Sequence, residues 1–146
     1  MKIIFLDIDG VLNSIVGSAK YLSFMEASKL QLLKDLIIES SADGVVIISD
    51  RRYSKYDMED ILDAFDEFEI YLIGSIRNPD DLDYEDNRGK QIQDYLENTK
   101  ENITSIVILD DNDDGISSYF NEEFIRINRY DGLTRDDVDR AIEKLG

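Results

Sequence analysis

The residues of this chain that could do chemistry begin near its amino end, where an apolar run stops at two carboxylates. Ile3–Leu6 is apolar, Asp7 and Asp9 follow, and Gly10 comes next. A short apolar run predicts a buried strand, and carboxylates just past the carboxyl end of a strand lie where open α/β sheets bind ligands. Because Asp7 and Asp9 are two residues apart, an extended backbone directs both side chains the same way. Asp-x-Asp is also common at ordinary strand ends, so partners elsewhere in the chain must decide its meaning.

Two further polar clusters follow apolar runs of the same kind. Val45–Ile48 leads into Ser49, and Ile106–Leu109 leads into Asp110 and Asp111. If all these runs are parallel strands, their carboxyl ends share one edge of the sheet. We therefore expect side chains that are far apart in the sequence to meet at that edge.

Up to four carboxylates, those of Asp7, Asp9, Asp110 and Asp111, would then lie close together. Without a counter-charge they would raise one another's pKa values, and a hard divalent cation relieves this repulsion. The chain contains neither histidine nor cysteine, so only oxygen ligands are at hand, and these favour magnesium over zinc or copper. The sequence predicts a magnesium site here, where the metal would also neutralise an incoming phosphate.

An EF-hand calcium loop is a rival explanation of the second acidic strand end. Asp110-x-Asn112-x-Asp114-Gly115 opens like such a loop. The loop needs a bidentate Glu at its twelfth position, which is Asn121 here, and a strand rather than a helix leads into it. The magnesium site is therefore favoured.

Composition excludes several classes of function. Without histidine or cysteine there is no Ser-His or Cys-His nucleophile and no disulfide. The net charge of −17 opposes unassisted binding to nucleic acid phosphates or to an anionic membrane, so we expect no tight non-specific nucleic acid binding. No apolar run approaches the length of a membrane helix, and the amino end does not resemble a signal peptide. We expect a cytoplasmic protein with no membrane partner.

Apolar spacing predicts the elements that must position these side chains. Helical periodicity marks residues 26–40, a segment around Met58–Phe65 capped by Ser54, a segment opened by Arg88-Gly89-Lys90, and a last helix after a Thr134/Asp137 capping box. Besides the three runs above, strands are expected at 69–73 and 124–127. Residues 14–25 read as a loop or flap over the end of the first strand, and 77–88 as a solvated acidic loop. Strands alternating with helices predict a parallel, doubly wound α/β sheet.

The string Phe5–Asn13 resembles the first motif of the haloacid dehalogenase (HAD) superfamily, most of whose members are magnesium-dependent phosphatases. The resemblance implies that Asp7 is the nucleophile that forms an aspartyl-phosphate. It implies that Asp9 is the general acid–base and that its backbone carbonyl binds the metal. Ser49 matches the second motif, a hydroxyl that hydrogen-bonds the phosphoryl group.

The resemblance also covers the fourth motif of the superfamily, a pair of acids on or near the metal. Asp110 and Asp111 match this pair, and Asp113 or Asp114 could serve in a variant of it. With Asp7 and the Asp9 carbonyl, they make up the metal ligands that the resemblance implies.

The third motif is a basic residue at the start of a helix, which stabilises charge on the transferred phosphoryl group. Arg88 and Lys90 both qualify, and we favour Arg88. The string Arg-Gly-x-x-Ile resembles a branch of the superfamily, the small HAD domain of Swiss-army-knife RNA-repair proteins. Ser49–Arg52, Leu109-Asp110-Asp111 and Gly132-Leu133-Thr134 resemble the same branch, which departs from this chain at Asp50 and Arg51, where serine and tryptophan are usual.

These features predict one HAD-like domain over residues 1–146. It has a three-layer Rossmann-like α/β fold with a parallel sheet of about five strands and helices on both faces. Neither gap between the motifs leaves room for a large cap domain. We expect a magnesium-dependent phosphatase acting through Asp7, whose substrate is a nucleotide, another phosphorylated small molecule or a nucleic acid end.

Two alternatives stay open. The first is a catalytically weak magnesium- or phosphate-binding module that regulates a partner: the presence of Asp9 speaks against it, and the extra negative charge of Asp50 keeps it open. The second is phosphoryl transfer to an acceptor other than water.

Overall fold

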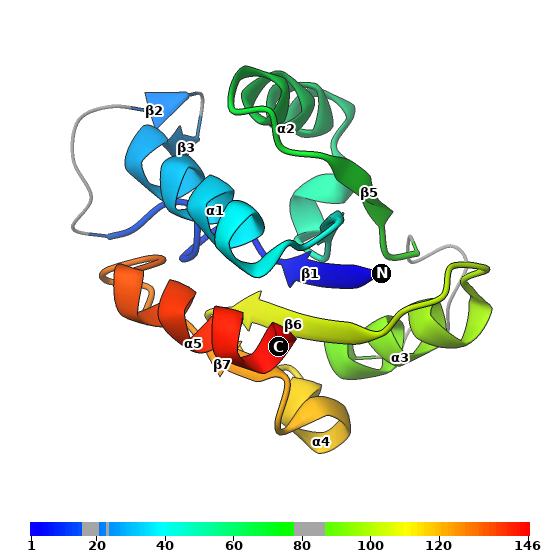
Figure 1. Cartoon of the computed structure of the whole chain (residues 1–146). Coiled ribbons are helices and arrows are strands. Elements are labelled where there is room, and N and C mark those ends of the chain that lie inside the picture. Colours follow the sequence, from blue (N-terminus) through cyan, green and yellow to red (C-terminus); the bar gives the residue numbers. More distant parts are fainter. Residues whose placement is uncertain (16–20, 23, 78–86) are drawn as a thin grey trace.

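Five parallel strands form the central sheet of the computed structural model, which describes residues 1–15, 21–22, 24–77 and 87–146. The strands are β1 (Lys2–Leu6), β4 (Gly44–Ile47), β5 (Leu72–Ser75), β6 (Ser105–Asp110) and β7 (Phe124–Arg126). Their order across the sheet is β5-β4-β1-β6-β7, and every neighbouring pair is parallel (Figure 1). β1 therefore lies at the centre of the sheet, between β4, which leads to Ser49, and β6, which leads to Asp110 and Asp111.

Helices cover both faces of this sheet, as predicted (Figure 1). Side chains alternate along a strand, so Ile4 and Leu6 of β1 face one side while Ile3 and Phe5 face the other. The first side packs against α1 (Ala27–Ser40), α2 (Lys55–Glu67) and α5 (Arg135–Leu145). The second side packs against α3 (Arg88–Asn98) and the short α4 (Ile116–Phe120).

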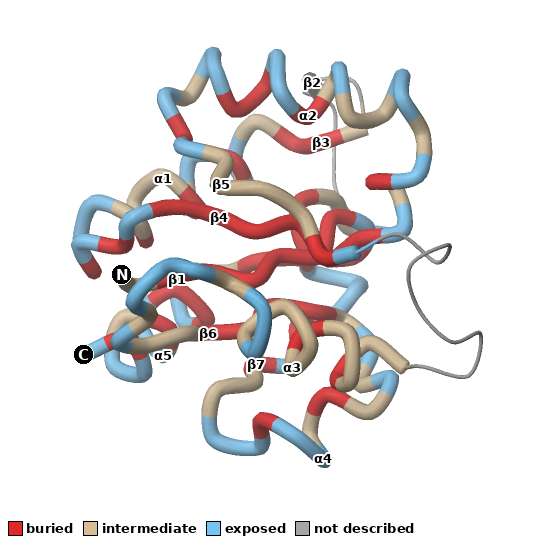
Figure 2. The backbone as a smooth tube through the Cα atoms, turned by 90° about the vertical axis from the view of Figure 1, so that its right-hand side faces the viewer, coloured by how far each residue is buried: buried red, intermediate tan, exposed pale blue. Residues whose placement is uncertain are grey.

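Burial follows the same layering. The central strands are buried along their length, whereas the helices expose their outer sides (Figure 2). The result is the predicted three-layer α/β fold, and the described residues contain no cap domain. No helix in this part of the chain combines the length and apolar character that crossing a membrane requires.

Local signals in the sequence place two helix starts correctly. The Ser54 side chain accepts a hydrogen bond from the Asp57 backbone N–H and caps α2. The Thr134 side chain accepts one from the Asp137 backbone N–H, and the Asp137 carboxylate accepts one from the Thr134 backbone N–H in return. The predicted capping box at α5 is therefore present.

Several short elements differ from expectation. The strand expected at 69–73 lies at Leu72–Ser75, because Glu69 adopts a positive φ of 54° in the turn that ends α2. The 3-10 helix η1 (Asp50–Tyr53) and α4 are too short to leave a periodic signal. Within the expected flap, β2 (Tyr21–Leu22) pairs antiparallel with β3 (Met25–Glu26). Residues 16–20, 23 and 78–86, which include most of the expected acidic loop, lie outside the described residues.

The first turn of α3 lies against the loop before α4. The Gly89 backbone N–H donates to the Asp114 carbonyl at 3.3 Å, and a Cβ at Gly89 would collide with the Gly115 carbonyl. Only glycine permits this approach, which sets the position of Arg88 at the start of the helix.

We predict that Gly89→Ala lowers the free energy of unfolding by about 1–3 kcal/mol, because the added methyl group must push two backbones apart. Urea unfolding measures the change. Gly74→Ala is the matched control, since a Cβ at Gly74 meets no atom within 4 Å. Equal unfolding curves for the two variants would contradict the proposed close approach.

Candidate active site

A pocket of about 210 Å³ lies at the carboxyl edge of the sheet. Its walls come from the ends of β1, β4 and β6, from the loop after β6, and from the first residue of α3. The lining residues are Asp7, Asp9, Ser49, Asp50, Arg88, Asp110, Asp111, Asn112 and Asp114. Two larger hollows lie elsewhere, one of about 550 Å³ along α5 and one of about 650 Å³ between the end of α3 and the start of β6. Neither contains a predicted site residue.

Backbone pairing brings the strand ends together. The Asp7 N–H donates to the Leu109 carbonyl at 2.9 Å, and the Ile48 N–H donates to the Leu6 carbonyl at 2.9 Å. Asp7 therefore lies beside Asp110 on one side and near the β4 end on the other. Three polar clusters separated by up to about a hundred residues meet, as the parallel topology requires.

Three carboxylates form the floor of the pocket. Asp7, Asp110 and Asp111 each offer an oxygen within 4.8 Å of those of the other two. Asp7 and Asp110 are buried, with 8% and 2% of their surfaces exposed. Gly10 makes this crowding possible: its φ is 79°, and a Cβ there would collide with the Asp111 carboxylate.

Burial and mutual repulsion hold a proton on this cluster. Desolvation, followed by the charge of Asp110 and side-chain contacts with Asp110 and Asp111, raises the pKa of Asp7 to about 9. Desolvation also raises the pKa of Asp110 to about 6, although Arg88 and the Asn112 backbone N–H act in the opposite direction. A divalent cation would replace the proton, and three oxygen ligands without nitrogen or sulfur suit magnesium.

Asp9 lies apart from these three. Its carboxylate accepts two hydrogen bonds from Arg51, from Nε and Nη2, each at 2.8 Å, and a third from Asn13 Nδ2 at 3.0 Å. Burial raises the pKa of Asp9, but the hydrogen bonds from Arg51 and Asn13 outweigh it and keep the pKa below its usual value. Of the four carboxylates expected to converge, three gather and the fourth is held by an arginine.

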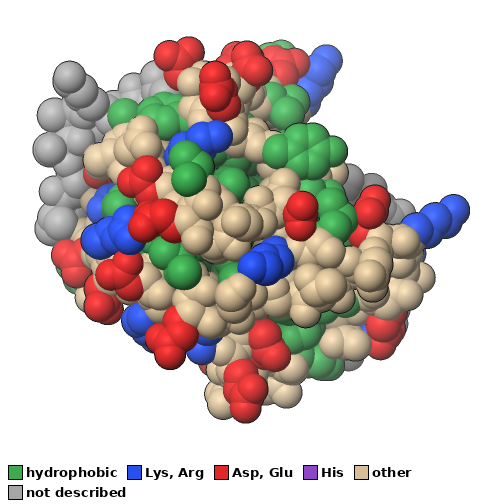
Figure 3. Space-filling view, viewed as in Figure 1, with side chains coloured by type: hydrophobic (Ala, Val, Ile, Leu, Met, Phe, Trp, Pro, Cys, Tyr) green, Lys and Arg blue, Asp and Glu red, His purple; other side chains and the backbone are tan. Residues whose placement is uncertain are grey.

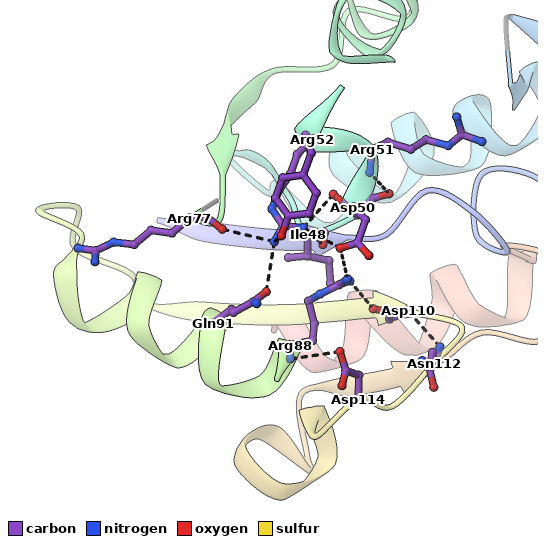
Figure 4. A network of polar contacts seen from close by, with 12 residues as sticks. Ile48, Asp50, Arg51, Arg52, Arg77, Arg88, Gln91, Asp110, Asn112 and Asp114 are labelled. Carbon is purple, nitrogen blue, oxygen red and sulfur yellow. Dashed lines mark hydrogen bonds and ion pairs between the residues drawn. The ribbon is translucent and has the colours of Figure 1, made fainter. Parts of the chain in front are cut away.

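Arg88 bridges two elements of the pocket, whereas Lys90 does not line it. Arg88 Nη1 donates to Asp110 at 3.2 Å and Nη2 donates to Asp50 at 3.0 Å (Figure 4). The Lys90 backbone N–H instead donates to the Asn87 side chain, which caps α3. The partial positive charge of the α3 amino end adds to that of Arg88 at this wall.

Ser49 and Arg52 shape the end of β4. Ser49 is 2% exposed, and its hydroxyl oxygen accepts a hydrogen bond from the Arg51 N–H, which begins η1. The Arg52 guanidinium donates to the carbonyls of Ile48 and Ser49 at 2.8 and 3.0 Å and to Gln91 of α3 at 3.2 Å (Figure 4). Arg52 thus ties the Ser49 turn to α3.

The acidic residues of the loop after β6 make contacts in two different places. Asp113 accepts hydrogen bonds from the backbone and hydroxyl of Ser117 and serves α4, away from the pocket. Asp114 lines the pocket and accepts a 3.3 Å hydrogen bond from the Arg88 backbone N–H. Asp110 ends a strand, and its Oδ1 accepts from the Asn112 N–H at 3.0 Å, so the segment is not arranged around one central ion as an EF-hand loop is.

Sequence patterns missed the ionic contacts of this site. Nothing in the sequence pairs Asp9 with Arg51 or Asp50 with Arg88, because the partners are 42 and 38 residues apart. The sequence offered one signal that Asp50 and Arg51 lie near the site, which is their position directly after Ser49.

Comparison with models of known families matches residues 3–138 to the HAD domain in Swiss Army Knife RNA repair proteins. The match includes every residue that lines the pocket. No curated protein and no solved structure matches the chain.

We predict that stability without metal falls as pH rises. Asp7 keeps its proton up to about pH 9 in the folded protein but has an ordinary value of 3.8 when unfolded. Between these values the folded state binds more protons, so the free energy of unfolding decreases with pH. Calorimetry in EDTA should show that the melting temperature drops between pH 5 and 9 by at least about 3 °C more in the wild type than in Asp7→Asn.

Magnesium should remove this pH dependence, because it stabilises the ionised carboxylates. Asp63→Asn, at an exposed position of α2, is the control and should keep the wild-type slope. A wild-type slope in Asp7→Asn would show that the proton lies elsewhere.

Proposed function

Since the chain belongs to the family of HAD domains found in Swiss Army Knife RNA repair proteins, we propose that it is a magnesium-dependent phosphohydrolase that works through an aspartyl-phosphate on Asp7. The observation that carries the proposal is the convergence of Asp7, two further acids, Ser49 and Arg88 on one pocket. A nucleophile, a metal site and donors for a phosphoryl group are thus within reach of one another.

Asp7, Asp110 and Asp111 would hold the magnesium ion, together with the Asp9 carbonyl. When bound, the ion would neutralise charge on the phosphate and keep Asp7 ionised. The Ser49 hydroxyl and the Arg88 guanidinium would hold the phosphoryl oxygens that gain charge in the transition state.

Two steps follow from this arrangement. In the first, a carboxylate oxygen of Asp7 attacks phosphorus, the bond from phosphorus to the leaving oxygen breaks, and Asp9 gives that oxygen a proton. In the second, Asp9 takes a proton from water as the water oxygen attacks phosphorus. The bond between phosphorus and Asp7 breaks, which releases inorganic phosphate and restores both carboxyl groups.

A phosphorylated nucleotide or nucleic acid end is the substrate class that fits best. The described residues contain no cap domain over the pocket, so a large leaving group can extend outward. On the face seen in Figure 3, acidic and basic side chains are interspersed and the basic ones form no continuous patch. With a net charge of −17, recognition should depend on the end of a nucleic acid and not on its backbone as a whole.

One observation favours the alternative of a weakly catalytic binding module. Carboxylates already pair with two arginines at the pocket, Asp9 with Arg51 and Asp50 with Arg88. Such a protein would bind magnesium and phosphate but turn over slowly. Activity measurements separate the two functions.

We predict that Asp7→Asn abolishes magnesium-dependent release of phosphate from a generic aryl phosphate, while the fold is kept. Asp9→Asn should slow turnover by ~10²–10⁴-fold, because a positioned general acid is lost. Phosphate release is measured with magnesium and with EDTA, and circular dichroism checks the fold. Full activity of Asp7→Asn would exclude the covalent mechanism, and wild-type protein that binds magnesium without turnover would favour the binding module.

We further predict that Arg88→Met reduces kcat/KM far more than Lys90→Met. Arg88 lines the pocket, and loss of a charged donor to the transition state costs about 10²–10³-fold. The Lys90 backbone N–H makes the capping contact, which a side-chain substitution keeps, and Lys90 does not line the pocket, so Lys90→Met should change the rate less than about threefold. Equal small effects would show that the third motif lies elsewhere.

A further inference from the structure

Arg51 lies beside the pocket and pairs with Asp9, a carboxylate that lines it. Its guanidinium binds both oxygens of the Asp9 carboxylate, each at 2.8 Å, and approaches Asp57 of α2 at 3.3 Å. Its guanidinium carbon also lies 3.7 Å from the centre of the Phe24 ring. The arginine therefore joins the end of β1, the start of α2 and the segment before β3.

This contact conflicts with the role proposed for Asp9. A general acid must present one oxygen, with its proton, to the leaving group. Here three N–H groups, two from Arg51 and one from Asn13, occupy both oxygens of Asp9. Release of Arg51 would open both oxygens of Asp9 to the leaving group, whereas most of their acceptor positions are filled in the paired state.

A second anion is the natural replacement for Asp9. A guanidinium binds phosphate with the same two-pronged geometry as carboxylate. Asp9, the proposed acid for the leaving oxygen, lines the pocket. Arg51 does not line the pocket but contacts Asp9 from outside it, so Arg51 lies close to the leaving group. The Arg51 side chain is 27% exposed, so an anion carried by the leaving group can reach it.

We propose that Arg51 determines specificity by selecting phosphomonoesters whose leaving group carries a second phosphate or phosphodiester. The second anion takes the place of Asp9 on Arg51 and frees Asp9 for proton transfer. A substrate with one phosphate offers no replacement for Asp9, so the contact between Arg51 and Asp9 must break without compensation and turnover is slower. The inference rests on the proposed phosphohydrolase function and adds a residue and a substrate feature to it.

The required chemistry has two sources, a small nucleoside bisphosphate and a phosphorylated nucleic acid end with its neighbouring phosphodiester. We propose to measure kcat and KM for adenosine 5′-monophosphate, adenosine 3′-monophosphate, adenosine 3′,5′-bisphosphate, and diadenylates phosphorylated at the 5′ or the 3′ end. The monophosphates identify the phosphate that is removed. The bisphosphate and the diadenylates then distinguish the two sources.

The wild type should prefer a substrate with the second anion by at least about tenfold in kcat/KM, the change that one charge-assisted hydrogen bond supplies. Arg51→Met should reduce this preference to less than about threefold, mainly through a higher KM for the doubly charged substrate. Its kcat for the monophosphate should rise, since Arg51 no longer holds Asp9. Arg51→Lys keeps the charge without the two-pronged contact and should lie between.

Arg135→Met is the matched control. Arg135 also binds both oxygens of a carboxylate, Glu39, at 2.7 Å and lies next to Asp139, but on α5 outside the pocket. It removes the same charge and should leave the substrate preference unchanged.

The two proposals fail in different ways. Phosphate release that depends on Asp7 but shows no preference for the second anion, or a preference that survives Arg51→Met, overturns the role of Arg51 alone. A loss of preference in Arg135→Met equal to that in Arg51→Met also overturns it. Absence of turnover with every substrate overturns the phosphohydrolase.

Binding decides the role of Arg51 even in that last case. Calorimetric titration of magnesium-loaded Asp7→Asn with adenosine 3′,5′-bisphosphate and with the monophosphates requires no turnover. The bisphosphate should bind at least about tenfold more tightly, and adding Arg51→Met should remove the difference. Equal affinities in the presence of Arg51 would contradict the proposal.

Discussion

Repulsion among buried carboxylates is the constraint on which this site depends. The parallel register of β1 and β6 places Asp7 beside Asp110, and the turn at Gly10 brings Asp111 against them. Burial and the charge of Asp110 raise the pKa of Asp7, so a proton remains on Asp7 at neutral pH in the absence of metal. A divalent cation would stabilise this site, because it would remove the repulsion among the buried carboxylates. The free energy of repulsion that the cation removes would contribute to its affinity.

Arginines balance the remaining charge, each in a different way. Arg88 is a first counter-charge for Asp110, but it also reaches Asp50, so it stands between the metal site and the second motif. Arg52 has a fully buried side chain and donates largely to carbonyls, so it fixes the turn of Ser49 and contributes little positive charge to the pocket. Arg51 is matched to Asp9. Acids of the chain thus pair with the guanidinium groups of both Arg51 and Arg88.

The main features of the site were predictable because they follow from two periodicities and one topological rule. Alternation along β1 and its position in a parallel sheet bring Asp7, Ser49 and Asp110 to one edge, whatever the length of the connections. Helical geometry also separates Arg88 from Lys90: residues two apart on a helix point about 200° apart, so only one of them can face the pocket. The pairs of Asp9 with Arg51 and Asp50 with Arg88 were not predictable, since no local pattern links them and their contact depends on the reach of flexible side chains. The start of β5 was not predictable either, because it depends on the positive φ of one residue, Glu69.

The ionic pairs around the pocket change what recognition of a phosphate means for so acidic a protein. An isolated arginine would attract any anion, including the backbone of any nucleic acid. An arginine already paired with a carboxylate gains little from one further phosphate, because the old contact must be given up for the new one. Exchange becomes favourable only where a ligand supplies two anions at the spacing of the pocket and of Arg51, so that magnesium takes one and the arginine takes the other. Under the proposed function, the acidic residues of the chain thus lower its affinity for phosphate in general. A substrate keeps high affinity only if its two anions reach both the pocket and Arg51.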